Sequence, residues 1–403
     1  MIRHPLASAL ALTLAVTPVA ALAAEELPVD IEAVGLTGRT IHVAPDGDDD
    51  ADGSEASPMR TLQAAADAVE PGDTVLVREG VYEDVDDTIP LQITKGGTEE
   101  NWVRFANYPG EVPTIDFDAL RGIEVQGADY VVIEGFEVVG PSADVDPEAA
   151  TEHAEGYEGN THTPTHFFSV GIRVSTRNDD PDDYSHHVIV RDNRIRDTSG
   201  GGIATARADY LLIEDNHVTG TSFYTPWGGS GISVWQSTNH DDRTDVYRTV
   251  VRGNTSAYND NKVKFWMIGK FSDGNGIIID ALRNTQPELL SGAEPTPYSG
   301  RVLVADNLCH DNGGRGINLY ESDNIDIFRN TLRNNARRDN IQQEVEFGRS
   351  ENVVLRHNLI VPADDRRAFG GYEYDDLTFE ENLILGGKKN GGFKLKGNTV
   401  AAE

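Results

Sequence analysis

The 403-residue chain has almost no cysteine and little lysine. Cys309 is the only cysteine, so no disulfide can form within the chain, and stability must come from burial and backbone hydrogen bonds. Only 8 of the 34 basic residues are lysines, and the 67 acidic residues leave a formal net charge of −33. This charge argues against nucleic acid as a partner. The acidic, lysine-poor composition predicts a halophilic-type surface. Repulsion among its acidic groups is screened in concentrated salt, because the screening length is about 3 Å at about 1 M salt.

Long apolar runs are also missing, apart from one at the start of the chain. Residues 1–23 begin with a basic segment around Arg3, continue through an apolar stretch and end in an A-x-A site at 21–23, as secretory signal peptides do. We therefore predict cleavage near Ala23, and a secreted or periplasmic protein. No later stretch is apolar enough to span a bilayer, so we expect a soluble monomer with no membrane contact.

A repeat replaces helical periodicity over most of the chain. Three alternating apolar residues are followed by a short polar step, an Asn, and an apolar residue two places on. The repeated Asn occupies Asn193, Asn216, Asn254, Asn307, Asn330, Asn358, Asn382 and Asn398. Asn tolerates the left-handed conformation of a tight bend, and stacked amides can bond to one another. We expect these Asn residues to be structural.

A second pattern, a Gly followed by a short apolar strand, lies between these copies. It begins at Gly122, Gly171, Gly202, Gly231, Gly276 and Gly316. Two or three short strands in about 23 residues describe one coil of a β-solenoid, which buries its apolar face only by stacking. The fold class predicted for residues 24–403 is therefore all-β: a single right-handed parallel β-helix. An amphipathic helix at 59–69 is expected to cap its N-terminal edge.

Long insertions interrupt the repeat at 140–168, 219–245 and 259–300. Insertions in neighbouring coils commonly wall a groove. One of them contains Lys262, Lys264 and Lys270, three of the chain's eight lysines within nine residues. This cluster indicates a site for a carboxylated sugar, although a basic surface loop that offsets neighbouring acids remains the alternative.

Three stretches of the sequence resemble known protein families. The opening IHVAPDGDDDADGSEASPMRTLQAAADAVEPGDTVLVREGVYED resembles the entry segment of right-handed β-helix polysaccharide lyases. The stretches YTPWGGSGISVWQS and GKFSDGNGIIIDALRNTQ are similar to alginate lyases of polysaccharide lyase family thirty-one. The resemblance implies β-elimination on a uronate polymer, with alginate as the expected substrate and a Lys and a Tyr as the proton-transfer pair. The calcium-binding aspartate cluster of family-nine pectate lyases has no residue-by-residue match. The sequence therefore leaves open whether Ca²⁺ is a cofactor.

Spacing to the repeat assigns the two roles. Lys270 lies six residues before Gly276, and Tyr224 lies seven before Gly231, so equivalent loops would project both side chains from adjacent coils. β-Elimination needs a base for the proton α to the carboxylate and an acid for the leaving oxygen. We predict Lys270 as the base and Tyr224 as the acid, with Lys262 as a further catalytic candidate.

The same register places candidate substrate-binding residues. Arg315 and Asn275 each precede a repeat Gly on adjacent coils, as a clamp for the uronate carboxylate. Arg173 is expected to point outward on the same face, and Lys264 belongs to the lysine cluster.

Three places past each Gly-Ile stand Trp235, Asp280 and Tyr320. Their aromatic rings suit sugar faces, although packing under the inserted loops would explain them equally well. Asp280 is a candidate Ca²⁺ ligand, hydrogen-bond orienter or partner of Arg315.

Three alternatives remain open, and the first is a pectate-type lyase. A β-helix glycoside hydrolase of the polygalacturonase type would show NTD, GHG and RIK signatures, which are absent; Asp273 and Asp280 are the only nearby pair for the two carboxylates that it needs. The DPHD signature of alginate epimerases is also absent. A non-catalytic carbohydrate-binding solenoid would need groove aromatics but no clustered lysines. His186 and Cys309 belong to the coil repeats and are expected to be structural.

Overall fold

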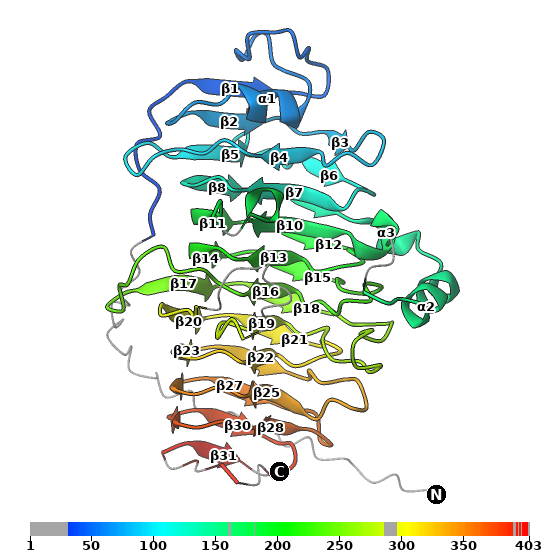
Figure 1. Cartoon of the computed structure of the whole chain (residues 1–403), viewed down its shortest axis with the longest axis vertical. Helices are drawn as coiled ribbons and strands as arrows, with labels where there is room; N and C mark the ends of the chain where they lie inside the picture. The colour runs from blue at the N-terminus through cyan, green and yellow to red at the C-terminus, as the bar shows by residue number, and fades with distance from the viewer. Residues whose placement is uncertain are drawn as a thin grey trace, which may run out of the picture.

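The computed structural model describes residues 31–401 except 160–162, 181, 286–295, 390–391, 394 and 396. Three parallel sheets wind into a right-handed β-helix whose coils stack along one long axis (Figure 1). This confirms the fold class predicted from the repeat. The predicted signal peptide at 1–23 lies outside the described residues. Within the described part of the chain, no helix has both the length and the apolar character needed to cross a membrane.

The first sheet opens each coil. It consists of β1 (Thr40–Val43), β2 (Thr74–Val77), β5 (Val103–Asn107), β8 (Val131–Glu134), β11 (His186–Arg191), β14 (Asp209–Glu214), β17 (Tyr247–Arg252), β20 (Arg301–Ala305), β23 (Ile325–Phe328), β26 (Val353–Arg356) and β29 (Leu377–Glu380).

The second sheet follows after a tight bend. It consists of β3 (Val81–Glu83), β6 (Thr114–Asp116), β9 (Glu137–Val139), β12 (Arg194–Arg196), β15 (His217–Thr219), β18 (Thr255–Ala257), β21 (Leu308–His310), β24 (Thr331–Arg333), β27 (Leu359–Val361), β30 (Leu383–Leu385) and β31 (Thr399–Ala401).

The third sheet completes the coil. It consists of β4 (Leu91–Ile93), β7 (Arg121–Gln126), β10 (Val170–Ser175), β13 (Ile203–Ala206), β16 (Ile232–Trp235), β19 (Ile277–Asp280), β22 (Ile317–Tyr320), β25 (Gln343–Gly348) and β28 (Arg367–Tyr372). The isoleucine after each repeat Gly pairs with the isoleucine of the next coil, as Ile232 does with Ile277. Side chains in this row point inward and are buried, so the Gly pattern marks the core side of the third sheet.

The repeated Asn forms a continuous ladder at the bend between the first and second sheets. Each amide Nδ2 donates to Oδ1 of the Asn one coil on, at 3.0 Å for Asn254 to Asn307 and 2.9 Å for Asn307 to Asn330. The same oxygens accept the backbone N–H one coil back. Every donor at the bend is thereby satisfied inside the protein, and the structural role predicted for these residues is confirmed.

A second, shorter ladder lies between the second and third sheets. Asn259 donates to Asn312 at 2.9 Å, and Asn312 donates to Asn335 at 2.7 Å. The ladder ends on the carboxyl group of Glu344, which accepts both the side-chain and the backbone N–H of Asn335. Burial raises the pKa of Glu344 to about 8 despite these two donors. Cys309 is fully buried nearby, as its place in the repeat predicts.

Helix α1 (Leu62–Ala68) covers the N-terminal end of the third sheet, as expected (Figure 1). Thr61 caps it by accepting the N–H of Ala64. Gln63 then stands in for the missing strand, because its Oε1 accepts the N–H of Gln92 at 2.9 Å and its Nε2 donates to the carbonyl of Gln92 at 3.1 Å. The edge strand β4 therefore meets an amide side chain in place of another chain.

A strand of the third sheet divides each of the two later insertions, whereas the first lies wholly before β10. Loops at 140–169, 220–231 and 258–276 lead into β10, β16 and β19, whereas loops at 236–246 and 281–300 leave β16 and β19. The first of these loops contains α2 (Pro147–Glu155), α3 (Thr165–Phe168) and a 3₁₀ turn at Pro141–Ala143. A second 3₁₀ turn, Arg177–Asp179, follows β10. The outer face of the third sheet is thus the surface bounded by inserted loops.

Candidate functional site

The outer face of the third sheet carries one row of aromatic and acidic side chains. Trp235 pairs with Asp280, and Asp280 pairs with Tyr320, on three successive coils. The row continues through Gly348 to Tyr372. Adjacent coils lie about 4.8 Å apart, so this row has the repeat of a surface on which an extended polymer can lie. The alignment of Trp235, Asp280 and Tyr320 was expected from the sequence; Tyr372 was not.

Gly348 lets two of these aromatic rings approach each other. A Cβ at this position would lie 3.1 Å from Oη of Tyr372 and 3.2 Å from Cδ2 of Tyr320. The two tyrosines therefore converge over a position that has no side chain. Tyr372 is 45% exposed, so its ring remains accessible to a ligand. The signal for this pair was available only from the register that carries the row past β22 into β25 and β28.

The carboxyl group of Asp280 on this face has a strongly raised pKa. Loss of hydration raises its pKa to about 8, and the negative charges of Asp273 and Glu321 add to the effect. Burial also raises the pKa of Asp273, against the lowering influence of Ser272, Arg315 and Asn275. A carboxyl group that titrates near pH 8 exchanges protons readily in the physiological range.

Tyr320 stands beside Asp280 with its proton retained. Burial raises the pKa of Tyr320 to about 12, with further contributions from Glu321 and Tyr372 and an opposing one from Arg349. Arg349 Nη1 donates to the phenol oxygen at 3.4 Å. The phenol hydrogen in turn bonds to the carboxylate of Glu321, which raises the pKa of Tyr320 and lowers that of Glu321.

Arg315 lies beside Asn275, but its partner is one that the sequence did not indicate. Its Nε and Nη2 donate to Oε2 of Glu346 at 2.9 and 2.7 Å, and its Nη1 donates to the carbonyl of Ser272 at 2.5 Å. The suggestion that Asp280 pairs with Arg315 is therefore wrong. Glu346 carries only a weak sequence signal, an acidic residue alternating with Val345 and Phe347.

Asn275 does not form a substrate clamp with Arg315. It is fully buried, and its Nδ2 donates to Ser230 at 2.9 Å and to Asp273 at 3.2 Å. Its Oδ1 accepts the backbone N–H of Arg315 at 2.8 Å. Since the whole amide is used inside the protein, Asn275 positions the strand ends that carry Arg315 and Asp273.

Tyr224 does not project from the coil as expected. It is 4% exposed and packs with Phe167, Val263 and residues of α2. The reason is that the 140–169 insertion folds over the loop that contains Tyr224. Burial raises the pKa of its phenol, with Asp146 adding to the shift. The side chain is therefore held in an apolar cluster and not on the groove surface.

The lysine closest to Tyr224 is Lys262, not Lys270. Lys262 Nζ lies 3.6 Å from the ring centroid of Phe223 and 5.2 Å from that of Tyr224. Burial lowers the pKa of Lys262, partly opposed by the charge of Asp260. The structure thus brings together a different Lys–Tyr pair from the one that sequence spacing indicated.

The other predicted cations lie on or beside the same face. Lys264 and Lys270 are exposed on the loop that leads into β19, and the carbonyl of Lys270 accepts the N–H of Phe265 across a short turn. Arg173 is half-buried on β10, in register with Glu124 on one side and Ala204 on the other. None of these placements tests the catalytic role predicted for Lys270 or the substrate-binding roles predicted for Lys264 and Arg173, which stay predictions.

The donor set of the groove does not match a calcium site. Ca²⁺ takes six to eight oxygen ligands, commonly from several carboxylates. Over the described residues, the groups of three His, Cys, Asp or Glu side chains with ligand atoms within 4.8 Å of one another comprise only His186, His187 and His240. In addition, Glu346 is engaged with Arg315.

A hollow of about 650 Å³ lies elsewhere, on the outer face of the second sheet. Its lining includes Glu137, Arg196 and His217. Arg196 pairs there with Glu137 at 3.1 Å and with Asp197 at 2.8 Å. No inserted loop that flanks the third sheet is among its lining residues, so we place the candidate site on the third sheet.

Comparisons with known proteins agree with the fold. Residues 41–175 match the family model of the Pel9A-like, right handed beta helix region. The uncharacterized protein YwoF of Bacillus subtilis (strain 168) is 23% identical over 430 aligned residues, covering 90% of this chain and 79% of that protein. Pectate lyase PEL9 of Emericella nidulans is 31% identical over 132 residues, covering 28% of this chain and 32% of that protein.

Solved structures share the solenoid at low identity. The complex structure of XylC with xylose has a TM-score of 0.51 at 11% identity and covers 90% of this chain and 86% of that one. An alginate lyase from Paenibacillus sp. str. FPU-7 has a TM-score of 0.49 at 14% identity, covering 85% and 99%. At such identities both likenesses concern the fold alone.

Proposed function

We propose that the chain is an exported polysaccharide lyase that cleaves a uronate polymer of the pectate class by β-elimination on the outer face of the third sheet. The observation that carries the class is the similarity to Pel9A-like proteins and to a pectate lyase. Neither of these is an alginate lyase, so they favour the pectate-type alternative over alginate as the first substrate to test.

The geometry supports specific residues as the proton acceptor and the proton donor. Asp280, with its pKa near 8, is the proton acceptor for the hydrogen α to the uronate carboxylate. Tyr320, one coil away in register, is the proton donor for the glycosidic oxygen that leaves. The electron pair of the broken C–H bond forms the new double bond as the C–O bond breaks. Trp235 and Tyr372 flank these two residues as stacking surfaces for neighbouring sugars.

The cationic loop supplies the charge that the reaction needs. Neutralising the uronate carboxylate makes the adjacent hydrogen acidic enough to remove, and a fixed cation does this best. Arg315 is already balanced by Glu346, whereas Lys264 and Lys270 are exposed on the loop beside the face. We therefore assign the loop lysines to substrate binding and keep Lys270 as the rival base.

The deciding experiment follows the unsaturated uronate that β-elimination alone creates. The protein is incubated with polygalacturonate, alginate and glucuronan, with and without Ca²⁺, and ultraviolet absorbance is recorded. Absorbance that rises with polygalacturonate supports the proposal; a rise with alginate alone would return the substrate to the first prediction. New reducing ends without absorbance would establish a hydrolase, with Asp273 and Asp280 as its carboxylate pair.

The pH profile separates the two roles open to Asp280. A base must be deprotonated, so lyase activity controlled by Asp280 rises as the pH increases through about 8. An acid must be protonated, so hydrolase activity would fall over the same interval. A lyase whose profile is unchanged in Asp280→Asn but collapses in Lys270→Ala would transfer the base to Lys270, with Lys264→Ala as the matched control.

A further inference from the structure

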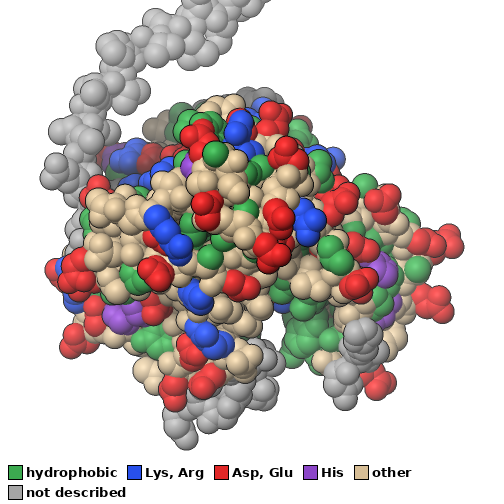
Figure 2. All heavy atoms as spheres, turned by 90° about the horizontal axis from the view of Figure 1, so that it is seen from above, with side chains coloured by type: hydrophobic (Ala, Val, Ile, Leu, Met, Phe, Trp, Pro, Cys, Tyr) green, Lys and Arg blue, Asp and Glu red, His purple; other side chains and the backbone are tan. Residues whose placement is uncertain are grey.

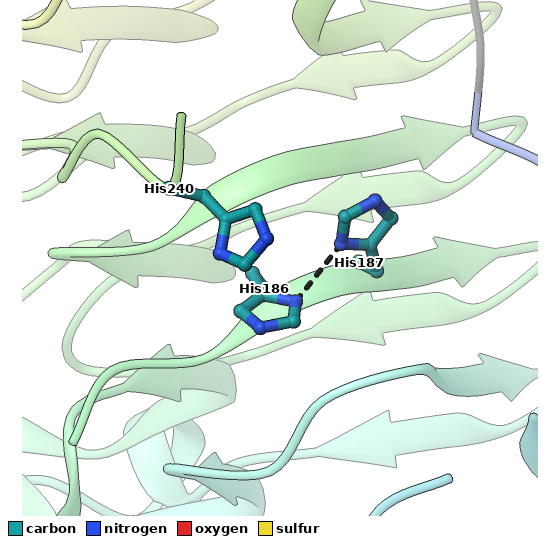
Figure 3. Close-up of side chains that lie close together, drawn as sticks. All are labelled: His186, His187 and His240. Atoms are coloured by element: carbon teal, nitrogen blue, oxygen red, sulfur yellow. Dashed lines mark hydrogen bonds between the residues drawn. The ribbon is translucent and has the colours of Figure 1, made fainter. Parts of the chain in front are cut away.

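Three histidines meet where the start of β11, in the first sheet, contacts the loop that leaves β16 (Figure 3). His186 and His187 begin β11, and His240 lies in the 236–246 loop. Their potential ligand nitrogens all lie within 4.8 Å of one another. The Nδ1 atoms of His186 and His187 are 2.9 Å apart, and the rings of His186 and His240 have centroids 3.9 Å apart.

The spacing resembles that of a metal-ligating trio. Zn–N distances of about 2.0–2.1 Å in a tetrahedral site place neighbouring nitrogens about 3.3 Å apart. The 2.9 Å contact between Nδ1 of His186 and Nδ1 of His187 leaves space for one proton at most, because two N–H groups would clash. At least one of these nitrogens therefore presents a lone pair to the other, as a ligand nitrogen does to a metal ion.

The surroundings of His186 and His187 fix the positions of both rings. The His187 ring is stacked between Tyr130 at 4.8 Å and Tyr210 at 4.3 Å. His186 is oriented by Asp129, whose Oδ1 accepts its backbone N–H at 2.9 Å and whose Oδ2 lies 3.5 Å from its Nε2. A carboxylate on the distal nitrogen of an imidazole is the usual support of a metal-bound histidine, and it leaves Nδ1 of His186 facing His187.

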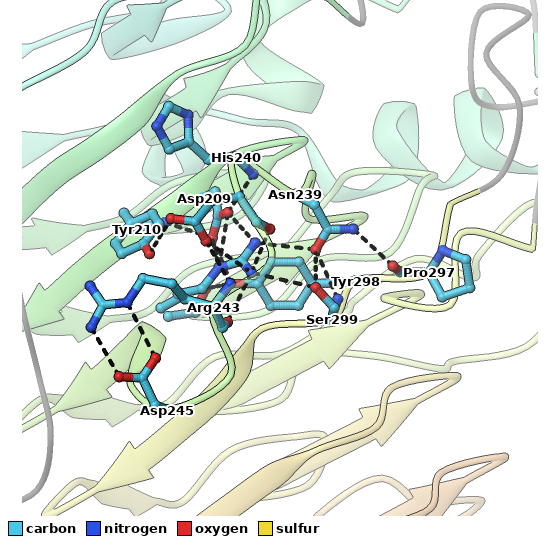
Figure 4. Close-up of polar contacts among 12 residues, drawn as sticks. Asp209, Tyr210, Asn239, His240, Arg243, Asp245, Pro297, Tyr298 and Ser299 are labelled. Atoms are coloured by element: carbon cyan, nitrogen blue, oxygen red, sulfur yellow. Dashed lines mark hydrogen bonds and ion pairs between the residues drawn. The ribbon is translucent and has the colours of Figure 1, made fainter.

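The third histidine, His240, is held in place by a buried polar network (Figure 4). The backbone N–H of His240 donates to Oδ2 of Asp209 at 2.8 Å. Asp209 is fully buried and paired with the fully buried Arg248. Arg248 also donates to Oδ1 of Asn239 at 3.1 Å, the residue next to His240. The loop is thereby held in place before any ligand arrives, as a preorganised site requires.

We propose that His186, His187 and His240 form a binding site for a divalent transition metal of the zinc class. Three neutral imidazoles favour Zn²⁺, Ni²⁺ or Cu²⁺ over Ca²⁺ and Mg²⁺, which prefer oxygen. His240 is exposed, so water completes the coordination from the solvent side. The ion fastens the 236–246 loop to β11, and that loop starts directly after Trp235 at the edge of the groove. This site stands apart from the proposed lyase chemistry and does not depend on it.

Isothermal titration of the untagged protein with ZnCl₂ tests the site, since a polyhistidine tag would bind the probe itself. We expect one Zn²⁺ per chain and a rise in the unfolding temperature when Zn²⁺ is added. His240→Ala changes an exposed side chain, and His187→Asn keeps a residue that tolerates the positive φ of 53° at that position. Each is expected to weaken Zn²⁺ binding at least tenfold. Asp129→Asn, which removes only the supporting carboxylate, should weaken it by about 10- to 100-fold.

His357→Asn is the matched control, because His357 also has a positive φ, at the bend that follows β26, but lies outside the trio. It should leave Zn²⁺ binding unchanged. Absence of stoichiometric binding by the unmodified protein would overturn the proposal and leave the trio as an aromatic stack. Binding that persists equally in His240→Ala and His187→Asn would overturn it as well. Circular dichroism of each variant, with Mg²⁺ as a negative probe, separates loss of the site from loss of the fold.

Discussion

The bend between the first and second sheets and the outer face of the third sheet share the same coil-to-coil register but use it differently. At the bend the same residue recurs on coil after coil, and each Asn bonds to the next. On the outer face the row changes from Trp235 to Asp280 to Tyr320 to Gly348. A repeated residue satisfies its own neighbours and produces stability. A row of unlike residues leaves donors, acceptors and rings for a ligand, so function is to be sought where the repeat varies.

The acidic surface forms a further contrast with both regions. Figure 2 shows Asp and Glu side chains spread over the end of the solenoid, with fewer Lys and Arg among them. Most basic residues of the chain are arginines. Many of these arginines are paired with acidic residues across coils, as Arg104 and Arg191 are with Glu134. Lys264 and Lys270 differ from these arginines, because they are exposed and lie on a loop beside the third sheet.

The largest expected effect tests the varied row. Asp280→Asn should lower kcat for lyase activity by about 10²- to 10⁴-fold, because it removes the proton acceptor while keeping the shape of the side chain. Steady-state kinetics on polygalacturonate at pH 9 measure this. Asp242→Asn, a change in an acidic residue of the 236–246 loop, should leave kcat within a factor of two.

The same variant should be more stable than the parent protein at high pH. The folded-state pKa of Asp280, about 8, lies above the ordinary value of 3.8, so the unfolded chain releases this proton at lower pH than the folded one. Stability is therefore lost as the pH rises from about 4 to 8, and Asn removes that loss. Urea midpoints at pH 5 and pH 9 should show the larger gain at pH 9; a gain that is equal at both would contradict the assigned pKa.

The next effect tests the repeated bend. Asn307→Ala removes the acceptor shared by the backbone N–H and Nδ2 of Asn254, and it removes the side-chain donor to Oδ1 of Asn330, which keeps only the backbone N–H of residue 307. At about 1–3 kcal/mol for each unsatisfied group, unfolding should become easier by several kcal/mol. Asn398→Ala, at the last position of the ladder, is the control and should cost less. Equal losses in urea unfolding would contradict the ladder as a cooperative element.

A smaller effect tests the aromatic part of the varied row. Tyr372→Ala should raise KM for the polymer by about threefold to tenfold, because one ring–sugar contact is worth about 0.5–1.5 kcal/mol, while kcat changes little. Leu308→Ala alters an exposed apolar residue on the second sheet and should leave KM unchanged. A fall in kcat with constant KM would instead give Tyr372 a part in the chemistry.

The smallest effect per charge concerns the acidic surface. Raising the salt concentration from about 0.1 to 1 M shortens the screening length from about 10 to 3 Å, which reduces repulsion among the excess acidic groups. The unfolding temperature should rise with salt in the parent protein and in Asn398→Ala alike. A fall on adding NaCl would show that the cross-coil arginine pairs contribute more than the net charge of −33 opposes.

The repeat determined the fold because a solenoid converts sequence period into spatial register. Once Asn254 and Asn307 are equivalent in the repeat, they are neighbours in space, whatever the length of the insertion between them. The same reasoning placed Trp235, Asp280 and Tyr320 in one row. These predictions needed only the rule that each coil contributes one residue to each position.

Side-chain partners within and between the inserted loops were decided by the tertiary structure alone. Tyr224 is buried because another insertion covers it, Arg315 bonds to Glu346 in place of Asp280, and His240 reaches His186 from a different segment. Insertions have no repeat and no fixed register, so their sequence does not say where they fold back. The sequence by itself determined the rows of the solenoid, and the packing of the loops decided which members of those rows are left to act.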